Sequence, residues 1–513
     1  MTELKKSNSN PVDDHPDNGE DAKSKEETQI HEMGNDQLNR ALSQRHLVMM
    51  AIGGVIGPGY FMGMGTGLST AGPAGLLICF AIVGLLLWFV IQSLGELGSF
   101  IAVSGSFTHY SARFIDPAWG FALGWNYFLL WAGIIMAEYN NLGLVLYYWE
   151  TDMPRWGWVM VFWVVFMSFA LLGVWAFGEA EFWLALIKVV AIAAFFVCSI
   201  LITTGVIGGE KIGFKYYHNP GPFADGVKGV FEIFVFAGLQ YSGTEMIGLT
   251  AGESRNPSKD IPKAVKNIVW RIVILFLGGI FFITITVPWD DERLLGETTS
   301  KSASSPFVIA FDRVEVTAGS HAVNAVILVT IFSAVNSAVY VGSRTLYGLA
   351  KEGAAPKVFL YTPKNGSPIV ALVVFHSLGF LSLLNLSSGA GVVYTWVISM
   401  TGVATFITWA TICICHIRLR KAMKLQKMSS SVLPYRTGTW PWGAYIGSGV
   451  SVFFIFFQGW TSFAPWNVQS FFMNYIIVIV FVVLGISWKI AHKTQWVRLE
   501  TADLVTGRRD WLM

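Results

Sequence analysis

The sequence predicts an all-α membrane protein with twelve transmembrane helices, and three observations lead to that fold class. The chain is 53% hydrophobic and only 13% charged, a composition far from that of a soluble domain. Apolar segments of about 20 residues, the length that a helix needs to cross a bilayer, recur along it. Two of these segments carry glycine and polar residues where a lipid-facing helix has to be unbroken, which indicates a site inside the membrane.

The chain divides into two tails and one membrane domain. Residues 1–46 are rich in Asp, Glu, Asn, Ser and Lys, so we expect a disordered cytoplasmic tail with no cleavable signal peptide. Residues 47–490 form the membrane domain, and residues 491–513 form a second cytoplasmic tail. The twelve predicted spans are 47–68, 74–99, 121–147, 156–177, 182–206, 227–249, 267–288, 321–343, 368–386, 389–412, 441–463 and 468–490.

Basic residues in the loops set the expected orientation. The loops after spans six, eight and ten are basic, whereas the opposite loops are short and neutral, or acidic. Cytoplasmic loops carry an excess of Lys and Arg, so these loops and both termini are expected in the cytoplasm. The basic residues flank the membrane and form no nucleic-acid-binding pattern. They are Arg255, Lys259, Lys263, Lys266, Lys351, Lys357, Lys364, Arg418, Arg420, Lys421, Lys424, Lys427 and Arg436.

The first interruption lies in span one, where residues 51–66 read AIGGVIGPGYFMGMGT. Six glycines weaken this helix, and Pro58 removes a backbone N–H and clashes with the preceding turn. The backbone groups left unpaired would be costly in lipid, but inside a protein they can hold a small ionic ligand. The alternative is that the glycines only let helices pack closely.

The second interruption lies five spans later, in span six. Its glycines and polar side chains are Gly238, Gln240, Ser242, Gly243, Thr244, Glu245 and Gly248. Paired interruptions at matching positions indicate two structural repeats with a ligand site between them. We therefore expect a five-plus-five inverted repeat of residues 47–206 and 227–412, with the last two helices, in residues 441–490, as an addition.

Several long blocks, in the right order, carry a resemblance to a known family. They read AIGGVIGPGYFMGMG, STAGPAGLL, LGELGSFIAVSGSFTHYSARFIDPAWGFALGWNYF, FGEAEFWLALIKVVAI, SGTEMIGLTAGESRNPSKDIPKAV, FSAVNSAVYVGSRTLYGLAKEGAAPKVF and TGVATFITWATICICHIRLRKAM. From about Arg45 to the last span, the chain resembles the fungal (yeast-type) amino acid permeases of the amino acid–polyamine–organocation superfamily. The resemblance implies the LeuT-type fold with broken helices one and six, no cofactor, and proton-driven uptake of amino acids across the plasma membrane.

The resemblance also implies how the substrate is held. Its carboxylate meets the broken first helix and its ammonium meets both broken helices, in agreement with the partial charges of helix ends. The transferred substrate-binding residues are Ile56, Gly57, Pro58 and Gly59 on the carboxylate side, and Phe236, Ala237, Gly238, Leu239 and Tyr241 on the ammonium and side-chain side. Phe236 or Tyr241 would form an aromatic lid. Pro58 departs from the family, whose members usually have a hydroxyl residue there, and it donates no N–H to a carboxylate.

Glu138 lies in the middle of span three and matches a family glutamate that affects substrate binding. A carboxylate inside the membrane is a functional candidate by default, because its burial is costly. It would contact the substrate ammonium, directly or through water, or take up the proton. The alternative is a structural pair with Asn126, Tyr139 or Asn140.

Lys188 lies in span five among apolar neighbours, in the stretch EFWLALIKVVAI. Burial makes its affinity for a proton sensitive to its surroundings. In related bacterial members, a lysine here stands where sodium-coupled relatives bind sodium. We therefore predict Lys188 as the proton-coupling group, with Glu138 as the second candidate. The alternatives are a structural pair or a side chain that extends to the cytoplasmic face.

Three further residues are predicted at the gate. Glu245 and Glu253, toward the cytoplasmic end of span six, are expected to hold the inner gate through basic partners such as Arg344 or Lys351. Ser337 in span eight is a secondary candidate, because the family places this segment beside the former sodium site.

Other polar residues of the spans are expected to be satisfied inside the bundle. Ser333 and Asn336 suit hydrogen bonds between helices, and His376 suits a core position. Cys413 and Cys415 are too isolated to indicate a metal site. Nothing in the sequence pairs a nucleophile with a base, so no enzyme is predicted.

The leading interpretation is a proton-coupled amino acid permease that works by alternating access. One alternative is an amino acid sensor that transports little. Another is a permease for a polyamine or a carnitine-like amine, in which Glu138 would be the main cation contact. The expected partners are an amino acid, the proton and the bilayer. Ubiquitin-ligase machinery is a further candidate partner, at the N-terminal tail residues Lys5, Lys6, Lys23 and Lys25.

Overall fold

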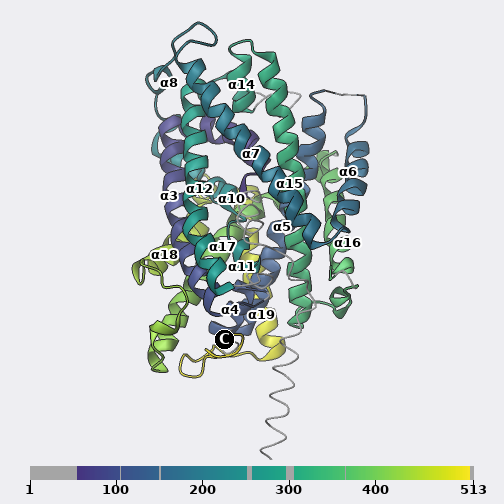
Figure 1. Ribbon diagram of the computed structural model, residues 1–513, viewed down its shortest axis with the longest axis vertical. Helices are drawn as coiled ribbons and strands as arrows, with labels where there is room; N and C mark the ends of the chain where they lie inside the picture. The colour runs from purple at the N-terminus through teal and green to yellow at the C-terminus, as the bar shows by residue number, and fades with distance from the viewer. Residues whose placement is uncertain are drawn as a thin grey trace, which may run out of the picture.

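The computed structural model is a long bundle of helices that run close to one direction (Figure 1). It describes residues 55–103, 105–149, 152–250, 257–295, 305–363, 366–386 and 388–508. Within these ranges the regular elements are all helical, apart from one isolated β-bridge between Phe463 and Trp466. The predicted all-α class is therefore confirmed.

Seven helices in the described ranges are long and apolar enough to cross a membrane. A shorter apolar helix, Arg155–Ala170, and the apolar stretch Ile272–Thr286 accompany them. A multi-pass membrane protein is thus confirmed, whereas twelve crossings and a five-plus-five repeat stay predictions. The seven segments are Gly59–Phe100, Pro117–Leu146, Trp175–Thr203, Thr317–Lys351, Ile369–Leu386, Met400–Leu425 and Val468–His492.

The described part of predicted span one and predicted span two are two helical segments that meet at a kink. The π-helix η1 (Gly59–Gly63) leads directly into α3 (Met64–Phe100). Inside α3, Gly72 has φ 75° and ψ 174°, and Pro73 follows it. A Cβ at Gly72 would lie 2.6 Å from the Ala224 backbone nitrogen, so only glycine suits both this conformation and this close contact.

Predicted span six is interrupted, as expected. It is divided into α9 (Gly226–Glu232), α10 (Phe234–Tyr241) and α11 (Met246–Thr250). Residues 242–245 between α10 and α11 are not helical, and Gly243 there has φ 92°. A positive φ is a conformation that glycine adopts readily, which explains why the helix stops here.

The remaining helices complete the bundle. They are α4 (Phe107–Phe114), α5 (Pro117–Leu146), α6 (Arg155–Ala170), α7 (Val174–Thr203), α8 (Lys215–His218), α12 (Pro257–Thr286), α13 (Glu292–Leu295), α14 (Pro306–Asp312), α15 (Thr317–Lys351), η3 (Lys357–Leu360), α16 (Ile369–Ser377), η4 (Leu378–Leu386), α17 (Ser388–Leu425), η5 (Ser430–Val432), α18 (Trp442–Phe457), η6 (Trp460–Ser462) and α19 (Val468–His492). Asp116 caps α5 by accepting a hydrogen bond from the Ala118 N–H, with Pro117 at the first helical position.

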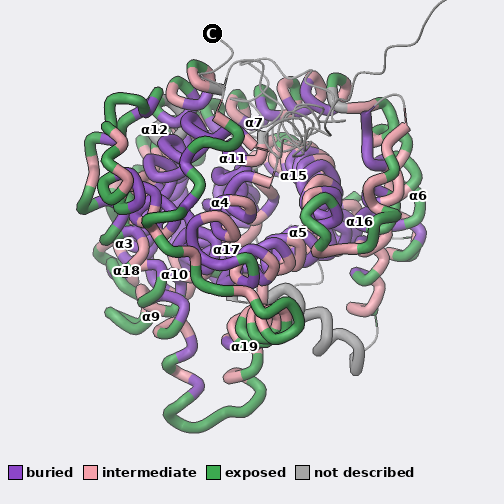
Figure 2. The backbone as a smooth tube through the Cα atoms, turned by 90° about the horizontal axis from the view of Figure 1, so that it is seen from below, coloured by how far each residue is buried: buried purple, intermediate pink, exposed green. Residues whose placement is uncertain are grey.

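Two groups of helices pack around a common centre. In one, α3 contacts α9, α10 and α12; in the other, α5 contacts α15, α17 and η4. Seen along the bundle, buried residues gather on α5, α15 and α17, while α6 and α19 lie at the periphery (Figure 2). Of the most apolar stretch of each helix, 89% is buried in α17 but only 11% in α19, so α17 is a core helix and α19 lies at the surface of the bundle.

The chain after α19 packs against one end of the bundle. Arg113 of α4 donates to the Asp503 carbonyl oxygen at 2.6 Å, and Gln426 donates to the Ala502 carbonyl oxygen at 2.7 Å. Leu504 is buried in the same contact. Burial raises the pKa of Asp503, but its hydrogen bonds with Thr506 and Val505 and the charge of Arg113 outweigh that effect and lower it.

Candidate functional site

A cavity of about 140 Å³ lies where the two interrupted helices meet. A cavity of this size holds a ligand about as large as benzene. The wall combines the chain just before η1, α5, the end of α10, α15 and α17. Its residues are Val55, Gly57, Gly59, Trp131, Gly133, Ile134, Ala137, Glu138, Asn141, Leu239, Gln240, Ser242, Ala334 and Thr401.

The first interrupted helix meets the cavity through Gly57 and Gly59. A Cβ at Gly57 would meet no atom within 4 Å, whereas one at Gly59 would lie 2.5 Å from the Gln240 Oε1 atom. Gly59 therefore leaves room for the Gln240 amide. Of the other two residues transferred from the family motif, Ile56 is completely buried, and Ile56 and Pro58 are both absent from the cavity wall.

The second interrupted helix turns only one of its faces to the cavity. Of the five residues predicted on α10, Leu239 lines the wall, and Phe236, Ala237, Gly238 and Tyr241 do not. A Cβ at Gly238 would lie 2.5 Å from the Phe406 ring, so that face packs on α17. Gln240 and Ser242 line the wall as well and were not predicted as substrate-binding residues.

Both predicted lid residues pack within the protein on the α3 side. The Phe236 ring lies 3.0 Å from the position of a Cβ on Gly63. The Tyr241 hydroxyl donates to the Phe80 carbonyl oxygen at 3.3 Å, and its ring packs against Phe276. In this structure neither ring covers the cavity.

Glu138 is the ionisable residue among those that line the cavity. Its side chain is buried, lies beside Asn141, and its Oε2 atom has no hydrogen-bond partner. The three residues considered as structural partners are engaged elsewhere. Asn126 forms hydrogen bonds with Ala404 and Thr408, Tyr139 with His376 at 2.6 Å, and Asn140 with Asn385 at 3.0 Å.

Lys188 belongs to a second polar cluster, between α7 and α15. Its Nζ atom donates to the Ser333 hydroxyl at 2.6 Å, and Ser333 in turn donates to Glu181. Asn336 also donates to Glu181, at 3.3 Å. Lys188 and Glu181 have no exposed surface, so the lysine does not extend to the cytoplasmic face.

Glu181 is a residue that the reasoning from sequence missed. It lies seven positions before Lys188 on α7. Residues seven apart on a helix lie on the same face two turns apart, so the spacing could have indicated the pair. Ser337, the secondary gate candidate, is buried and lies beside the same carboxylate, but its hydroxyl forms no hydrogen bond with it.

Glu245 accepts hydrogen bonds from neutral groups in the non-helical joint after α10. The donors are the Gly243 N–H at 3.1 Å, the Trp409 indole at 3.2 Å and the Tyr127 hydroxyl at 3.4 Å. The joint is thereby bound to α5 and α17, whereas the expected contact was with a basic residue. Glu253 lies outside the described residues.

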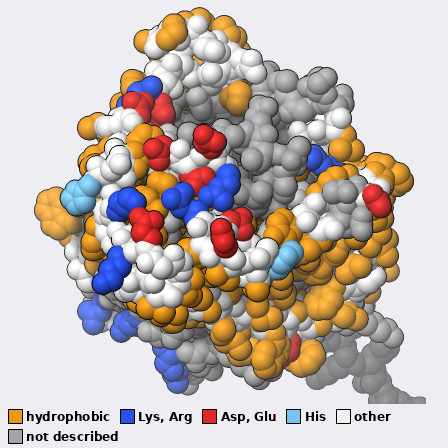
Figure 3. Space-filling model, turned by 90° about the horizontal axis from the view of Figure 1, so that it is seen from above, with side chains coloured by type: hydrophobic (Ala, Val, Ile, Leu, Met, Phe, Trp, Pro, Cys, Tyr) orange, Lys and Arg blue, Asp and Glu red, His pale blue; other side chains and the backbone are white. Residues whose placement is uncertain are grey.

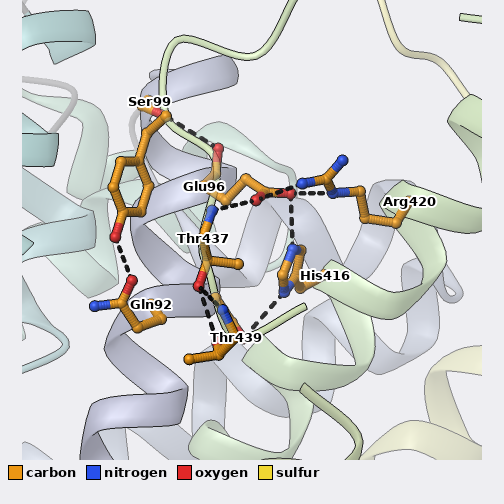
Figure 4. Close-up of polar contacts among 9 residues, drawn as sticks. Gln92, Glu96, Ser99, His416, Arg420, Thr437 and Thr439 are labelled. Carbon is orange, nitrogen blue, oxygen red and sulfur yellow. Dashed lines mark hydrogen bonds and ion pairs between the residues drawn. The ribbon is translucent and has the colours of Figure 1, made fainter. Parts of the chain in front are cut away.

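A fourth carboxylate, Glu96, joins α3 to α17 near the end where the C-terminal residues pack. The two oxygens of Glu96 contact His416 Nε2 at 2.8 Å and the Arg420 guanidinium at 2.5 and 2.9 Å. Glu96 also accepts from the Thr437 N–H at 3.1 Å, and Figure 4 shows it between these three groups. Because the carboxylate is completely buried, this network fixes α3 against α17.

The opposite end of the molecule carries acidic and basic side chains among apolar ones (Figure 3). There Asp291 accepts hydrogen bonds from Arg293 at 2.9 Å and from Arg313 at 2.8 Å. Burial raises the pKa of Asp291, but these hydrogen bonds and the positive charge of Arg293 outweigh burial and lower it. Arg313 also donates to the Tyr216 hydroxyl, so the cluster ties α8 to the segment around α13 and α14.

Among the described residues, no three His, Cys, Asp or Glu side chains lie close enough together to bind a metal ion. Cys413 and Cys415 are buried in α17.

Comparison with known proteins gives consistent matches over most of the chain. The sequence model of the amino acid permease family matches residues 46–500. A general amino acid permease of Saccharomyces cerevisiae is 39% identical, over 92% of this chain and 85% of its own length. A lysine-specific permease of the same yeast is 38% identical, over 92% of this chain and 79% of its own length. A general amino acid permease of Candida albicans is 36% identical, over 93% of this chain and 82% of its own length.

Proposed function

This chain belongs to the amino acid permease family, and from that premise we propose that it takes up amino acids with protons across the plasma membrane by alternating access. The observation that carries the proposal is the cavity between the two interrupted helices, with the Oε2 atom of Glu138 unpaired at its wall. A buried carboxylate without a full set of hydrogen bonds is costly, and a substrate ammonium removes that cost.

The substrate lies with its ammonium toward Glu138 and its carboxylate toward Gly57 and Gly59. Leu239 forms part of the pocket for its side chain. Ile56 and Pro58 shape the turn that carries the two glycines. Phe236, Ala237, Gly238 and Tyr241 act indirectly, because they hold α10 against α3 and α17.

The proton is carried by the Lys188 cluster. Lys188 and Glu181 share Ser333 as a hydrogen-bond partner, so a change in the charge of either residue alters the contact between α7 and α15. A proton that neutralises Glu181 weakens its attraction for Lys188. Substrate and proton then shift the same equilibrium between conformations, which is the thermodynamic requirement for coupling.

The moving parts are two bundles of helices. The bundle of α3, α10 and α12 rocks against the bundle of α5, α6, α15 and α16. Glu245 serves as a gate residue by binding the joint after α10 to α5 and α17, and Ser337 by its place beside Glu181. Glu253 and the tail lysines that would accept ubiquitin are retained from the family resemblance alone.

A second cargo class is favoured by the same carboxylate. Because Glu138 is the ionisable group among the residues that line the cavity, a polyamine or a carnitine-like amine would also find its cationic contact there. Such a cargo would depend on Glu138 and would gain little from the glycines of the broken turn.

Uptake by a permease-deficient host that expresses the protein tests these proposals. A panel of radiolabelled amino acids, spermidine and carnitine is measured at pH 5 and pH 7.5. The expected result is saturable amino acid uptake that rises at pH 5, is lost in Glu138→Gln and loses its pH dependence in Lys188→Ala. Glu500→Gln, which changes an exposed carboxylate after α19, is the control.

Two results would redirect the proposal. Uptake of spermidine or carnitine without uptake of any amino acid would show that the cargo is a polyamine or a carnitine-like amine. Protein that reaches the surface, transports nothing and is stabilised against heat by an amino acid would make the chain a sensor.

A further inference from the structure

The Gln240 side chain lies directly against the broken turn of the first helix. A Cβ built on Gly59 would lie 2.5 Å from its Oε1 atom and 2.7 Å from its Nε2 atom. One built on Gly63, a turn later, would lie 3.3 Å from Nε2. The amide therefore occupies the space beside the turn that the missing side chains leave free.

The broken turn itself offers few N–H donors. The Gly57 N–H is bonded to the Val55 carbonyl oxygen at 3.0 Å, and the Tyr60 N–H to the Gly57 carbonyl oxygen at 3.1 Å. Pro58 has no N–H. Among residues 57–60, Gly59 alone can therefore offer an N–H to a ligand. A carboxylate usually accepts two or more hydrogen bonds, so it needs another donor nearby.

The Gln240 amide can supply that donor. Its side chain is 8% exposed, lines the cavity, and takes part in none of the hydrogen bonds between described residues. Its NH₂ group is therefore a donor that a carboxylate in the cavity can use.

We propose that Gln240 is a specificity-determining residue that binds the substrate carboxylate with its amide NH₂ group, in place of the backbone N–H that Pro58 lacks. This inference rests on the proposed function, because it requires a substrate with a carboxylate. Gln240 and Pro58 then act as a pair across the two interrupted helices. Gln240 favours an α-amino acid over an amine of the same size that has no carboxylate.

Uptake of radiolabelled L-alanine, with L-alaninamide as a competitor that lacks the carboxylate, tests the inference. Gln240→Leu keeps the side-chain volume but removes the donor. We expect it to raise the KM for alanine about 10- to 100-fold, as for loss of a hydrogen bond to a charged group, with Vmax and the inhibition constant of alaninamide unchanged. Gln240→Glu, which replaces NH₂ by a negatively charged oxygen, is expected to raise the KM further.

A second substitution distinguishes recognition from a structural effect. Pro58→Ala restores an N–H, so the double variant Pro58→Ala/Gln240→Leu is expected to recover much of the affinity that Gln240→Leu loses. Gln458→Leu, which removes an amide at the end of α18, is the control and keeps the wild-type KM. Surface protein is measured for every variant.

Three outcomes would overturn the inference. An unchanged alanine KM in Gln240→Leu, with normal uptake by the wild type, would refute it and leave the proposed function intact. Equal weakening of alanine and alaninamide would show that Gln240 only shapes the cavity. Absence of uptake of any amino acid by the wild type would refute the proposed function itself.

Discussion

The Glu181–Lys188 cluster allows a prediction with a definite sign and size. Glu181→Gln removes the negative charge from a site that has no exposed surface, while Lys188 stays buried beside it. The glutamine keeps one carbonyl oxygen, although Ser333 and Asn336 both donate to the carboxylate in the native protein. One donor is therefore left without its acceptor, and the lysine loses the carboxylate with which it interacts most strongly.

Both losses act in the same direction. Removal of one partner from a buried ion pair costs about 3–5 kcal/mol, because the remaining charge is uncompensated. Lys188→Met is expected to cost a similar amount, since it leaves Glu181 uncompensated. The double variant Glu181→Gln/Lys188→Met removes both charges of this pair, so its loss should be smaller than the sum of the two single losses by at least about 3 kcal/mol.

Thermal unfolding of the purified protein measures this difference. The chain contains 21 tryptophans, so intrinsic fluorescence reports the transition. The expected order of melting temperature, from highest to lowest, is the wild type, the double variant and then either single variant, with the exposed control Glu500→Gln close to the wild type. Single-variant losses that simply add in the double variant would refute the argument, because they would show that the two charges do not interact.

Three further predictions concern other parts of the molecule. Glu138→Gln should abolish saturable uptake yet change the melting temperature little, since it removes both a buried oxygen without a hydrogen-bond partner and the attraction of this carboxylate for Lys188. Asp291 has a lowered pKa, so its stabilising contribution is present above the ordinary value of about 4 and is lost as the pH falls through the lowered pKa. The melting temperature of Asp291→Asn should therefore fall less steeply than that of the wild type as the pH is lowered. The same pH dependence in both proteins would contradict the lowered pKa of Asp291. Gly72→Ala should destabilise the protein by at least about 1–3 kcal/mol, because alanine is strained at φ 75° and meets backbone atoms; a normal melting temperature would contradict the kink geometry.

The positions of the helices could be predicted from the sequence, whereas the face that each helix turns to the cavity could not. Hydrophobic length is a local property, and the interruptions at Gly57–Gly59 and Gly243 follow from residues with unusual backbone preferences. The orientation of α10 depends on a distant residue instead. Gly238 packs on the Phe406 ring, which directs Gln240 and Ser242 to the cavity, and no local pattern predicts that contact.

The same difference explains the outcome for the charged residues. Lys188 and Glu138 were found because a charge within an apolar span is unusual in itself. Glu181 stands near the beginning of its span beside Glu179, where a charge needs no explanation, and only its contacts with α15 distinguish it. The neutral donors to Glu245 come from three different segments, so a basic partner was the simpler expectation.

Comparison of the buried carboxylates indicates why Glu138 differs from the others. Glu96, Glu181 and Glu245 are all completely buried, and each accepts hydrogen bonds on both oxygens from donors of the protein. Those residues join helices and are satisfied without a ligand. Glu138 is buried as well, but one of its oxygens has no partner and its side chain lines the cavity. Among these four carboxylates, Glu138 therefore has an unsatisfied oxygen that destabilises the protein until an ammonium group binds to it. A transported amino acid should then raise the melting temperature of the wild type and not that of Glu138→Gln.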